Sequence, residues 1–298
     1  MKKYILLTIS ASMSLIVHST GKESFPVENL QLWLAADQGI TTKDNSSKGG
    51  SKNDIISWVD QSKQKVTVVP AFEDISTRPS LIEKINEING KPALKFEGKG
   101  SSNFDITDAL IGKFKKPFDL NRGTVFLVAK MSSVPTISPM TLSATANSKT
   151  GRGGLGIRRG GNADSWFCVH YGGPGNGKKI QSQESKLDTK FHILTVNFDK
   201  HKSELKMIVD GQETGTELRD KSTLPLEPIN YIQIGGHGIL DPAGDPGSEW
   251  FFNGIIAEII VFNKIIGEDP ENGPYAAVGN YLQTKYGISG KFSEPDLK

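Results

Sequence analysis

The sequence FNGIIAEIIVFN at residues 252–263 is an almost continuous apolar run that contains a single acid, Glu258. It is too short to span a bilayer, and its β-branched residues favour a strand over a helix. The segment that follows, Pro274–Tyr286, has the pattern of an amphipathic helix, with Pro274 in the first turn and Gly287 just after the end. We therefore predict a buried strand near the C-terminus, followed by a helix that packs on the sheet.

Short apolar segments separated by turn residues recur through the rest of the chain, and amphipathic helices are almost absent. This pattern predicts an antiparallel β-sandwich or barrel rather than a parallel α/β fold. Asp210-Gly211 lies between two strand-like segments and is a strong hairpin signal, which predicts a meander of three strands. We expect strands at residues 30–34, 55–59, 93–96, 124–130, 140–146, 154–158, 166–171, 192–198, 205–209, 231–234 and 255–262.

The N-terminal residues have the pattern of an export signal. Lys2 and Lys3 precede an apolar stretch, and Val17-His18-Ser19 fits a cleavage site after Ser19. We expect residues 1–19 to be a signal peptide, residues 25–290 to form one domain and residues 291–298 to be a disordered tail. The protein would then be exported, to a secreted, periplasmic or cell-surface location.

Charge and cysteine content limit the classes of partner. The chain has 35 Lys and Arg against 33 Asp and Glu, and loss of Lys2 and Lys3 would leave 33 of each. A chain with no net charge gives no reason to expect nucleic acid or an anionic membrane as a partner. Cys168 is the single cysteine, so no disulfide can form within the chain, and its strand-like surroundings suggest a small core residue.

Several segments occur in the following order along the chain: Leu32-Trp33-Leu34-Ala35-Ala36-Asp37, Ser57-Trp58-Val59-Asp60-Gln61-Ser62, Arg78-Pro79, Asn89-Gly90-Lys91-Pro92-Ala93-Leu94-Lys95-Phe96, Phe252-Asn253-Gly254, Ile256-Ala257-Glu258-Ile259, Tyr281-Leu282 and Lys285-Tyr286-Gly287-Ile288. Together they resemble the LamG-like, concanavalin A-like lectin/glucanase domains of exported bacterial proteins. The resemblance implies a jelly-roll sandwich of two antiparallel sheets with a short C-terminal helix. Domains of this kind often bind glycans.

Catalytic motifs known for related folds are missing from the sequence. Glucanases of this type carry three acids along one strand, whereas Glu258 is followed only by apolar residues. Glu258 is therefore either a catalytic acid or metal ligand, or a structural residue that holds the C-terminal helix, and we favour the structural role. The lyase pattern is also incomplete, because Gln233 and His237 have no evident arginine-rich partner strand.

Flat aromatic rings beside polar side chains suit glycan binding, because sugars present both apolar ring faces and hydroxyl groups. On this ground the candidate ligand-binding residues are Trp166, His170, Tyr171, His237, Trp250 and Arg158. Alternation along residues 166–171 places Trp166, Cys168 and His170 on one face of a strand. We expect the opposite face, with Phe167 and Val169, to point to the core.

A loop rich in glycine and proline, residues 235–247, precedes the apolar run. Asp241, Asp245 and Glu249 lie in or beside it and could offer hard oxygen ligands to Ca²⁺. We therefore expect a calcium site here and no other cofactor.

The sequence thus predicts an exported, non-catalytic carbohydrate-binding or adhesive module whose partner is a glycan or polysaccharide. Two alternatives stay open. One is a glycoside hydrolase or polysaccharide lyase on the same fold, and the other is an extracellular protein–protein interaction module. The enzyme would need several catalytic side chains in one groove, and the interaction module would need an extended apolar surface.

Overall fold

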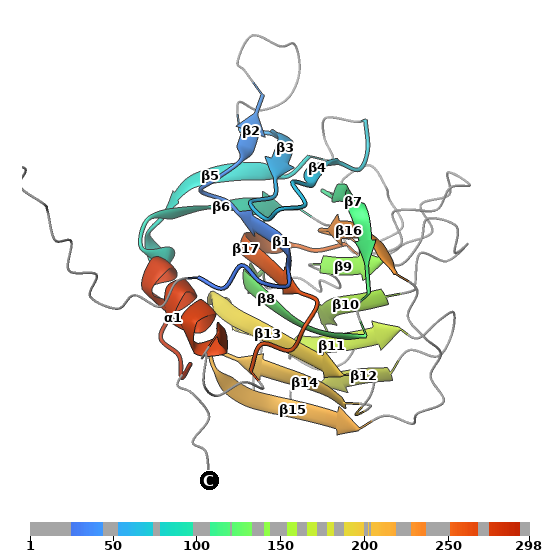
Figure 1. The fold of residues 1–298 in the computed structure, drawn as a ribbon. Helices are drawn as coiled ribbons and strands as arrows, with labels where there is room; N and C mark the ends of the chain where they lie inside the picture. Colours follow the sequence, from blue (N-terminus) through green and yellow to red (C-terminus); the bar gives the residue numbers. More distant parts are fainter. Residues whose placement is uncertain are drawn as a thin grey trace, which may run out of the picture.

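A computed structural model describes residues 25–43, 53–73, 78–97, 108–119, 121–132, 140–143, 154–159, 166–171, 178–181, 188–199, 202, 204–218, 228–236, 251–267 and 274–292. Within these residues the strands form two antiparallel sheets that lie against each other (Figure 1). One α-helix, α1 (Pro274–Tyr286), follows the last strand. The chain is therefore an all-β, two-sheet jelly-roll sandwich with a short C-terminal helix, as predicted from the sequence.

The two sheets have the following strands. Sheet A has the order β15 (Gln212–Leu218), β14 (Glu204–Val209), β13 (His192–Asp199), β8 (Arg122–Met131), β17 (Gly254–Phe262), β6 (Lys91–Phe96) and β5 (Ser80–Ile85), with β1 (Leu30–Ala35) also paired to β17. Sheet B has the order β12 (Lys178–Gln181), β11 (Trp166–Tyr171), β10 (Gly154–Arg159), β9 (Met140–Ser143), β16 (Ile229–Ile234), β7 (Leu110–Phe118), β4 (Thr67–Pro70), β3 (Ile55–Val59) and β2 (Ile40–Thr42). A short 3-10 helix, η2 (Asn86–Ile88), joins β5 to β6.

Every strand expected from the sequence is present, with ends that differ by a few residues. The hairpin at Asp210-Gly211 is also confirmed, because both residues have positive φ angles, 49° and 76°, between β14 and β15. Sequence reasoning missed β2, β4, β5, β7 and β12. β5 is an edge strand without a buried residue, so its sequence shows no apolar face.

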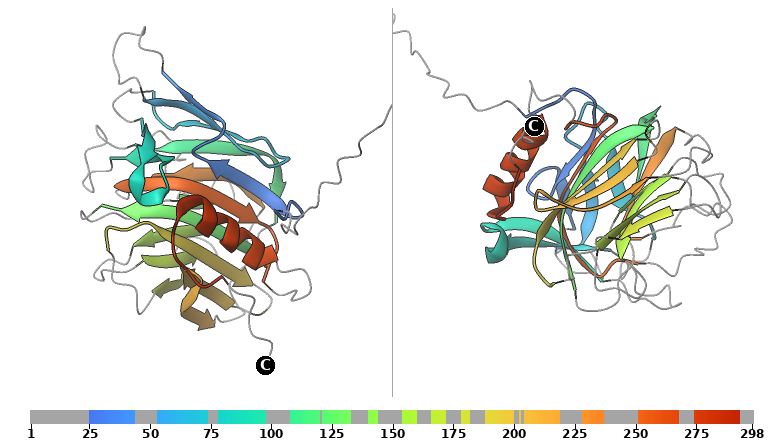
Figure 2. Two further views of the ribbon diagram at one scale, coloured as in Figure 1. Left: turned by 90° about the vertical axis from the view of Figure 1, so that its left-hand side faces the viewer. Right: turned by 90° about the horizontal axis from the view of Figure 1, so that it is seen from below.

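The core has two layers. One cluster of buried side chains fills the space between the sheets, and a second lies between the outer face of sheet A and α1. The helix lies flat on that outer face, so the molecule has three layers (Figure 2). The expected packing of the helix on the sandwich is therefore confirmed. No helix among the described residues is both long and apolar enough to cross a membrane.

The packed structure continues past residue 290. Phe292 is 2% exposed and belongs to the cluster under α1, where its ring lies against Gly279. The backbone N–H of Lys291 donates to the carbonyl oxygen of Asp210 at 2.8 Å. The expected tail beginning at residue 291 therefore starts too early, because an aromatic side chain anchors this segment. Residues 293–298 lie outside the described part of the chain.

A β-bulge at Ala257 decides where Glu258 points. β17 pairs with β8 as Ile256 with Ala129 and then Glu258 with Val128, so Ala257 has no partner of its own on that strand. Strict alternation would put Glu258 on the same face as Ile256, which faces sheet B. The bulge moves Glu258 to the outer face, toward α1.

Candidate functional site

The candidate ligand-binding residues fall on sheet B and on the loop between β16 and β17. Arg158 lies in β10, and Trp166, His170 and Tyr171 lie in β11. The structure describes the backbone of these four residues but not their side chains. His237, Trp250, Asp241, Asp245 and Glu249 lie outside the described residues.

The strand register places some of these residues at one end of sheet B. Ile234, the last residue of β16, pairs with Met140, and Met140 pairs with Ile157 on β10. Arg158 follows Ile157 and pairs with Phe167, next to Trp166 on β11. Arg158, Trp166 and Gly236, the residue just before the loop 237–250, therefore lie at the same end of the sheet, which we call the loop end.

Both ends of the loop are tied together there. Gly236 and Phe251 form an isolated β-bridge, and the N–H of Phe252 donates to the carbonyl oxygen of Gly235 at 2.9 Å. The loop thus leaves sheet B and returns to sheet A at nearly one point. β16 and β11 are three strands apart, which corresponds to about 14 Å at ~4.8 Å per strand.

Tyr171 does not join this group. It pairs with Gly154 at the opposite end of β10, and the length of β11 separates it from Trp166 by about 17 Å at ~3.3 Å per residue. His170 lies one residue from Tyr171. The backbone therefore places Arg158 and Trp166 at the same end of sheet B but on opposite faces, because Arg158 pairs with Phe167 and Trp166 pairs with Arg159. It places Tyr171 and His170 at the other end of β11.

The register also revises which face of β11 belongs to the core. Cys168 pairs with Ile157 and His170 pairs with Leu155, and both Ile157 and Leu155 are fully buried. Residues that are paired directly across an antiparallel ladder lie on the same face. The face of β11 with Trp166, Cys168 and His170 is therefore the core-facing one, the reverse of the expected assignment. The alternating apolar residues of β10 would have been a better basis for predicting which face of β11 points to the core.

One buried acid at the loop end was not identified from the sequence. Asp108 lies just before β7 and is 4% exposed, and its carboxylate accepts a hydrogen bond from the N–H of Glu97 at 2.7 Å. A Cβ atom at Gly235 would lie 2.6 Å from the carbonyl oxygen of Asp108, so the acid is next to the start of the loop. Burial, with a smaller effect of the nearby Glu97 and Asp54 carboxylates, raises the pKa of Asp108 to about 7.

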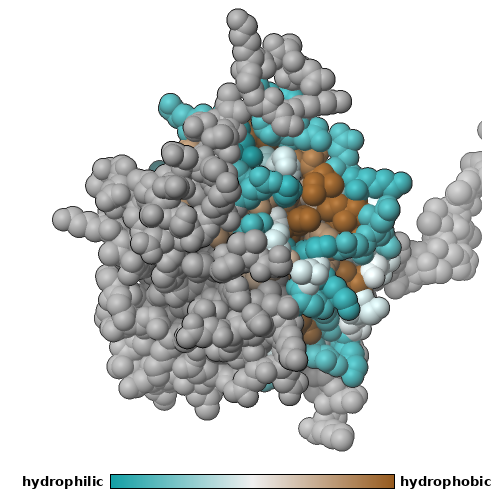
Figure 3. All heavy atoms as spheres, turned by 180° about the vertical axis from the view of Figure 1, so that it is seen from behind, coloured by the Kyte–Doolittle hydropathy of each residue, from teal (hydrophilic) through white to brown (hydrophobic). Residues whose placement is uncertain are grey.

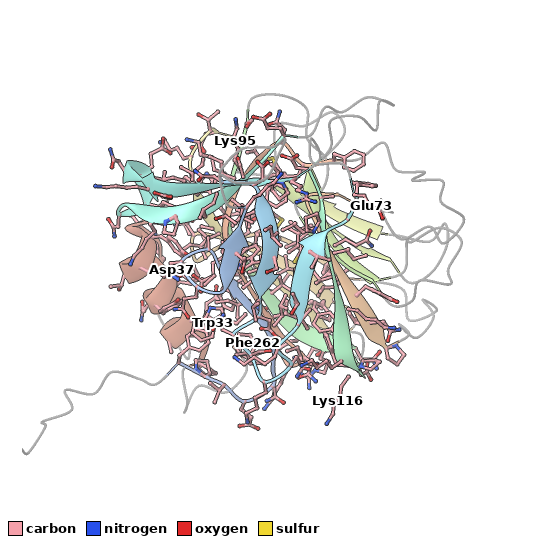
Figure 4. The ribbon with its side chains drawn as sticks, turned by 90° about the horizontal axis from the view of Figure 1, so that it is seen from above. Trp33, Asp37, Glu73, Lys95, Lys116 and Phe262 are labelled. Atoms are coloured by element: carbon pink, nitrogen blue, oxygen red, sulfur yellow. The ribbon has the colours of Figure 1, made fainter. Side chains whose placement is uncertain are left out.

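The structure assigns Glu258 to a different place and role. Its carboxylate is 1% exposed and lies under α1. It accepts hydrogen bonds from the Trp33 indole N–H at 2.6 Å and from the Tyr281 and Tyr286 hydroxyls at 3.0 and 2.6 Å. The Lys285 ammonium donates to it at 2.8 Å and also to Asp37 at 2.8 Å. Trp33 and Asp37 both lie on the side of the sandwich that carries α1 (Figure 4).

This network is structural. Tyr281, Lys285 and Tyr286 lie on the last turns of α1, so three of the four donors belong to the helix. Burial, followed by the repulsion of Glu258, raises the pKa of both tyrosines, so they remain protonated donors. Four donors therefore surround its two oxygens, two on each. The structural interpretation of Glu258 agrees with this geometry.

A groove lies beside this network, between α1, the turn after β1 and the turn between η2 and β6. It has a volume of about 990 Å³, and its lining includes Phe25, Asp37, Asn89, Lys91, Asn280 and Tyr281. The Phe25 ring stacks on the Trp33 indole with centroids 4.3 Å apart and an angle of 14° between the planes. We call this cavity the α1 groove.

The metal prediction has no counterpart in the described residues. Among them, no group of three or more His, Cys, Asp or Glu side chains could hold a metal ion. The expected calcium ligands Asp241, Asp245 and Glu249 lie outside the described part of the chain. The calcium site therefore stays a prediction.

The fold is similar to that of known binding domains. The binding domain of botulinum neurotoxin DC in complex with SialylT matches at a TM-score of 0.54 and 12% identity, over 86% of this chain and 52% of that chain. The binding domain of botulinum neurotoxin serotype D matches at 0.51 and 12%, over 85% and 52%. The serotype C1 binding domain matches at 0.50 and 13%, over 78% and 52%.

These matches concern the fold alone, because the identities are low. This chain spans about half the length of the domains that it matches. No protein-family model matches the sequence, and no curated protein is similar to it. The structural neighbours are consistent with the jelly-roll fold that the sequence motifs implied.

Proposed function

We propose that the protein is an exported, non-catalytic carbohydrate-binding module and that its glycan site is at the loop end of sheet B. The observation that supports this site is the strand register, which places Arg158, Trp166 and Gly236, the residue before the loop 237–250, at one end of sheet B. Trp166 is the first residue of β11 and so lies at the rim of the sandwich, where a tryptophan ring would suit the apolar face of a sugar. The similarity to a toxin binding domain in complex with SialylT is in line with a glycan ligand.

The non-catalytic part of the proposal rests on Glu258. Glu258 was the acid that the sequence offered as a candidate catalytic acid. In the structure, its hydrogen-bond donors are the side chains that fix α1 to sheet A. Export is proposed from the signal-like residues 1–19 alone. Asp241, Asp245 and Glu249 are the proposed ligands of a calcium ion in the loop that follows Gly236.

A second candidate function, cleavage of a polysaccharide, is favoured by one observation. Asp108 lies at the loop end with a pKa of about 7, so it can carry a proton at neutral pH, as a general acid must. If the enzyme hypothesis is right, incubation with the bound polysaccharide will release new reducing ends, and Asp108→Asn will stop the release. If no ends appear above the rate of the buffer blank, the non-catalytic proposal holds.

A protein–protein module would need an extended apolar surface. In the view from behind, the described residues are mainly hydrophilic, with one apolar patch among them (Figure 3). The large apolar side chains that are exposed in the described part are Val27, Ile56 and Val69. This surface supports a protein–protein module less strongly than the loop end supports a glycan-binding module.

The test is a glycan array with residues 20–298, with and without EDTA. Trp166→Ala should abolish binding, whereas Tyr171→Ala, at the far end of the same strand, should leave it unchanged. Circular dichroism on both variants establishes that they are folded. Loss of binding with EDTA alone supports the calcium loop. An array without any bound glycan, or equal losses in the two variants, would overturn the proposed site.

A further inference from the structure

The helix α1, which forms one wall of the α1 groove, lies on the other side of the sandwich from β9, β10 and β11 (Figure 1). We propose that it is a second binding site, which takes a small polyhydroxylated ligand with one carboxylate, such as a uronic acid unit. The site does not depend on the glycan site proposed at the loop end. Its ligand class follows from the walls of the groove, its unused polar groups and its charge.

Aromatic rings form one wall of the groove. Phe25 and Tyr281 both line it, and their rings meet edge to face with centroids 5.2 Å apart. Trp33 covers one face of the Phe25 ring and holds it in place. A fixed ring of this kind can pack against the C–H face of a pyranose, with little loss of side-chain entropy on binding.

Two polar side chains on the other walls have no hydrogen-bond partner within the described part of the chain. Gln38 and Asn280 line the groove with side-chain amides that make no hydrogen bond to a described residue. Each amide offers two donors and one acceptor, which matches the mixed demand of a sugar hydroxyl. Asn89 is different, because its amide donates to the Thr284 carbonyl oxygen at 3.3 Å and fixes the turn against α1.

One lysine that lines the groove has no acidic partner among the described residues. Lys285 is only 8% exposed and lies 2.8 Å from both Asp37 and Glu258, so its charge is matched within the protein. Lys91 also lines the groove, and no described acid lies within ion-pair distance of it. A single ammonium beside neutral amides suits one carboxylate, whereas phosphate sites more often use arginine forks or backbone N–H groups.

The probe for this site is sodium glucuronate, with methyl glucoside as its neutral counterpart. Saturation-transfer NMR should detect glucuronate on the folded protein, and the neutral sugar should give a weaker signal. Lys91→Met should weaken glucuronate binding by at least about tenfold, because a charge-assisted contact is lost. Lys91→Arg should retain most of the affinity.

Two further variants make the outcome decisive. Asn280→Ala, on the exposed side of α1, should also weaken binding. Lys95→Met changes a lysine on the same strand as Lys91 that already pairs with Glu97 outside the groove, and it should have no effect. The proposal is overturned if glucuronate gives no transfer, or if Lys91→Met and Lys95→Met bind it equally. Trp166→Ala must leave glucuronate binding at the α1 groove intact, so failure of one site is distinguishable from failure of the other.

Discussion

Glu258 shows how one buried charge can define the contact between a helix and a sheet. Its four donors come from β1 and from the last turns of α1, and one of them, Lys285, brings the matching charge. A buried carboxylate without donors would cost far more than such a network contributes, so the partners are interdependent. The same four contacts fix the rotation of α1, because Tyr281, Lys285 and Tyr286 must all reach one point.

This interdependence predicts a large effect from a small change. Glu258→Ala should lower the free energy of unfolding by about 3–5 kcal/mol, because the buried Lys285 ammonium would lose a partner and the other donors their acceptor. Glu258→Gln keeps an acceptor oxygen and should cost less. Urea denaturation measures both. Glu87→Ala, which removes an exposed acid paired with Lys130, is the control and should cost less than about 1 kcal/mol. Equal losses for Glu258→Ala and Glu87→Ala would contradict the structural role.

At the scale of elements, sequence reasoning succeeded where the signal is local. The bounds of α1 follow from Pro274 and from Gly287, whose φ of 66° and N–H bond to the Gln283 carbonyl oxygen at 2.8 Å end the helix. The Asp210-Gly211 hairpin is equally local. The bulge at Ala257 is not, because it depends on how β17 matches the register of β8.

Gly279 in α1 provides a test of how the helix packs. A Cβ atom there would lie 2.2 Å from the Phe292 ring, so the glycine makes room for that side chain. Gly279→Ala should therefore destabilise the protein, even though alanine favours a helix by about 1 kcal/mol. A Cβ atom at Gly279 would also lie 2.5 Å from the Cβ atom of Phe292, so only a Phe292→Gly background removes the clash, and there the same substitution should become stabilising.

A double-mutant cycle measured by urea denaturation checks this reversal of sign. The control is Asn280→Ala, the neighbouring exposed position of the same helix, whose effect should be the same in both backgrounds. If Gly279→Ala destabilises equally with and without the Phe292 ring, then Phe292 does not pack against the helix as described.

At the scale of the whole molecule, the two-sheet fold could be predicted because each strand carries its own apolar pattern. The places of the candidate residues could not be predicted, because they depend on pairings between distant strands. Trp166 and Tyr171 are close in sequence, yet the register puts them at opposite ends of sheet B. Asp108 carries no sequence signal, since only its burial makes it unusual.

Global stability should depend on pH through a cluster that joins β13 to the β14–β15 turn. The two ring nitrogens of His192 lie 2.6 Å from Asp210 and 2.8 Å from Asp188. Hydrogen bonds to these acids outweigh burial and raise the pKa of His192 above its ordinary 6.5. The same contact outweighs the burial of Asp188 and lowers the pKa of that acid below its ordinary 3.8. Lys190 adds a weak attraction, with 3.9 Å between its ammonium and Asp188.

The sign of the effect follows from these shifts. The folded state holds the His192 proton more tightly, so this contribution to stability is complete below pH 6.5 and is lost as the pH rises through the raised pKa. The Asp188 contribution is present above pH 3.8 and is lost as the pH falls through the lowered pKa. The cluster should therefore stabilise the protein most between about pH 4 and pH 6.5.

Asp108 also makes stability fall with rising pH, because its pKa in the folded protein is raised to about 7. The effect of His192 is therefore isolated by the difference in free energy of unfolding between the native protein and His192→Gln. Urea denaturation measures this difference from pH 5 to pH 9. This difference should be largest at pH 5 and should shrink as the pH rises, whereas Asp108→Asn should leave the His192 difference unchanged. A difference that is constant across this range would mean that His192 is held as a neutral ring, with no preference of the folded state for its proton.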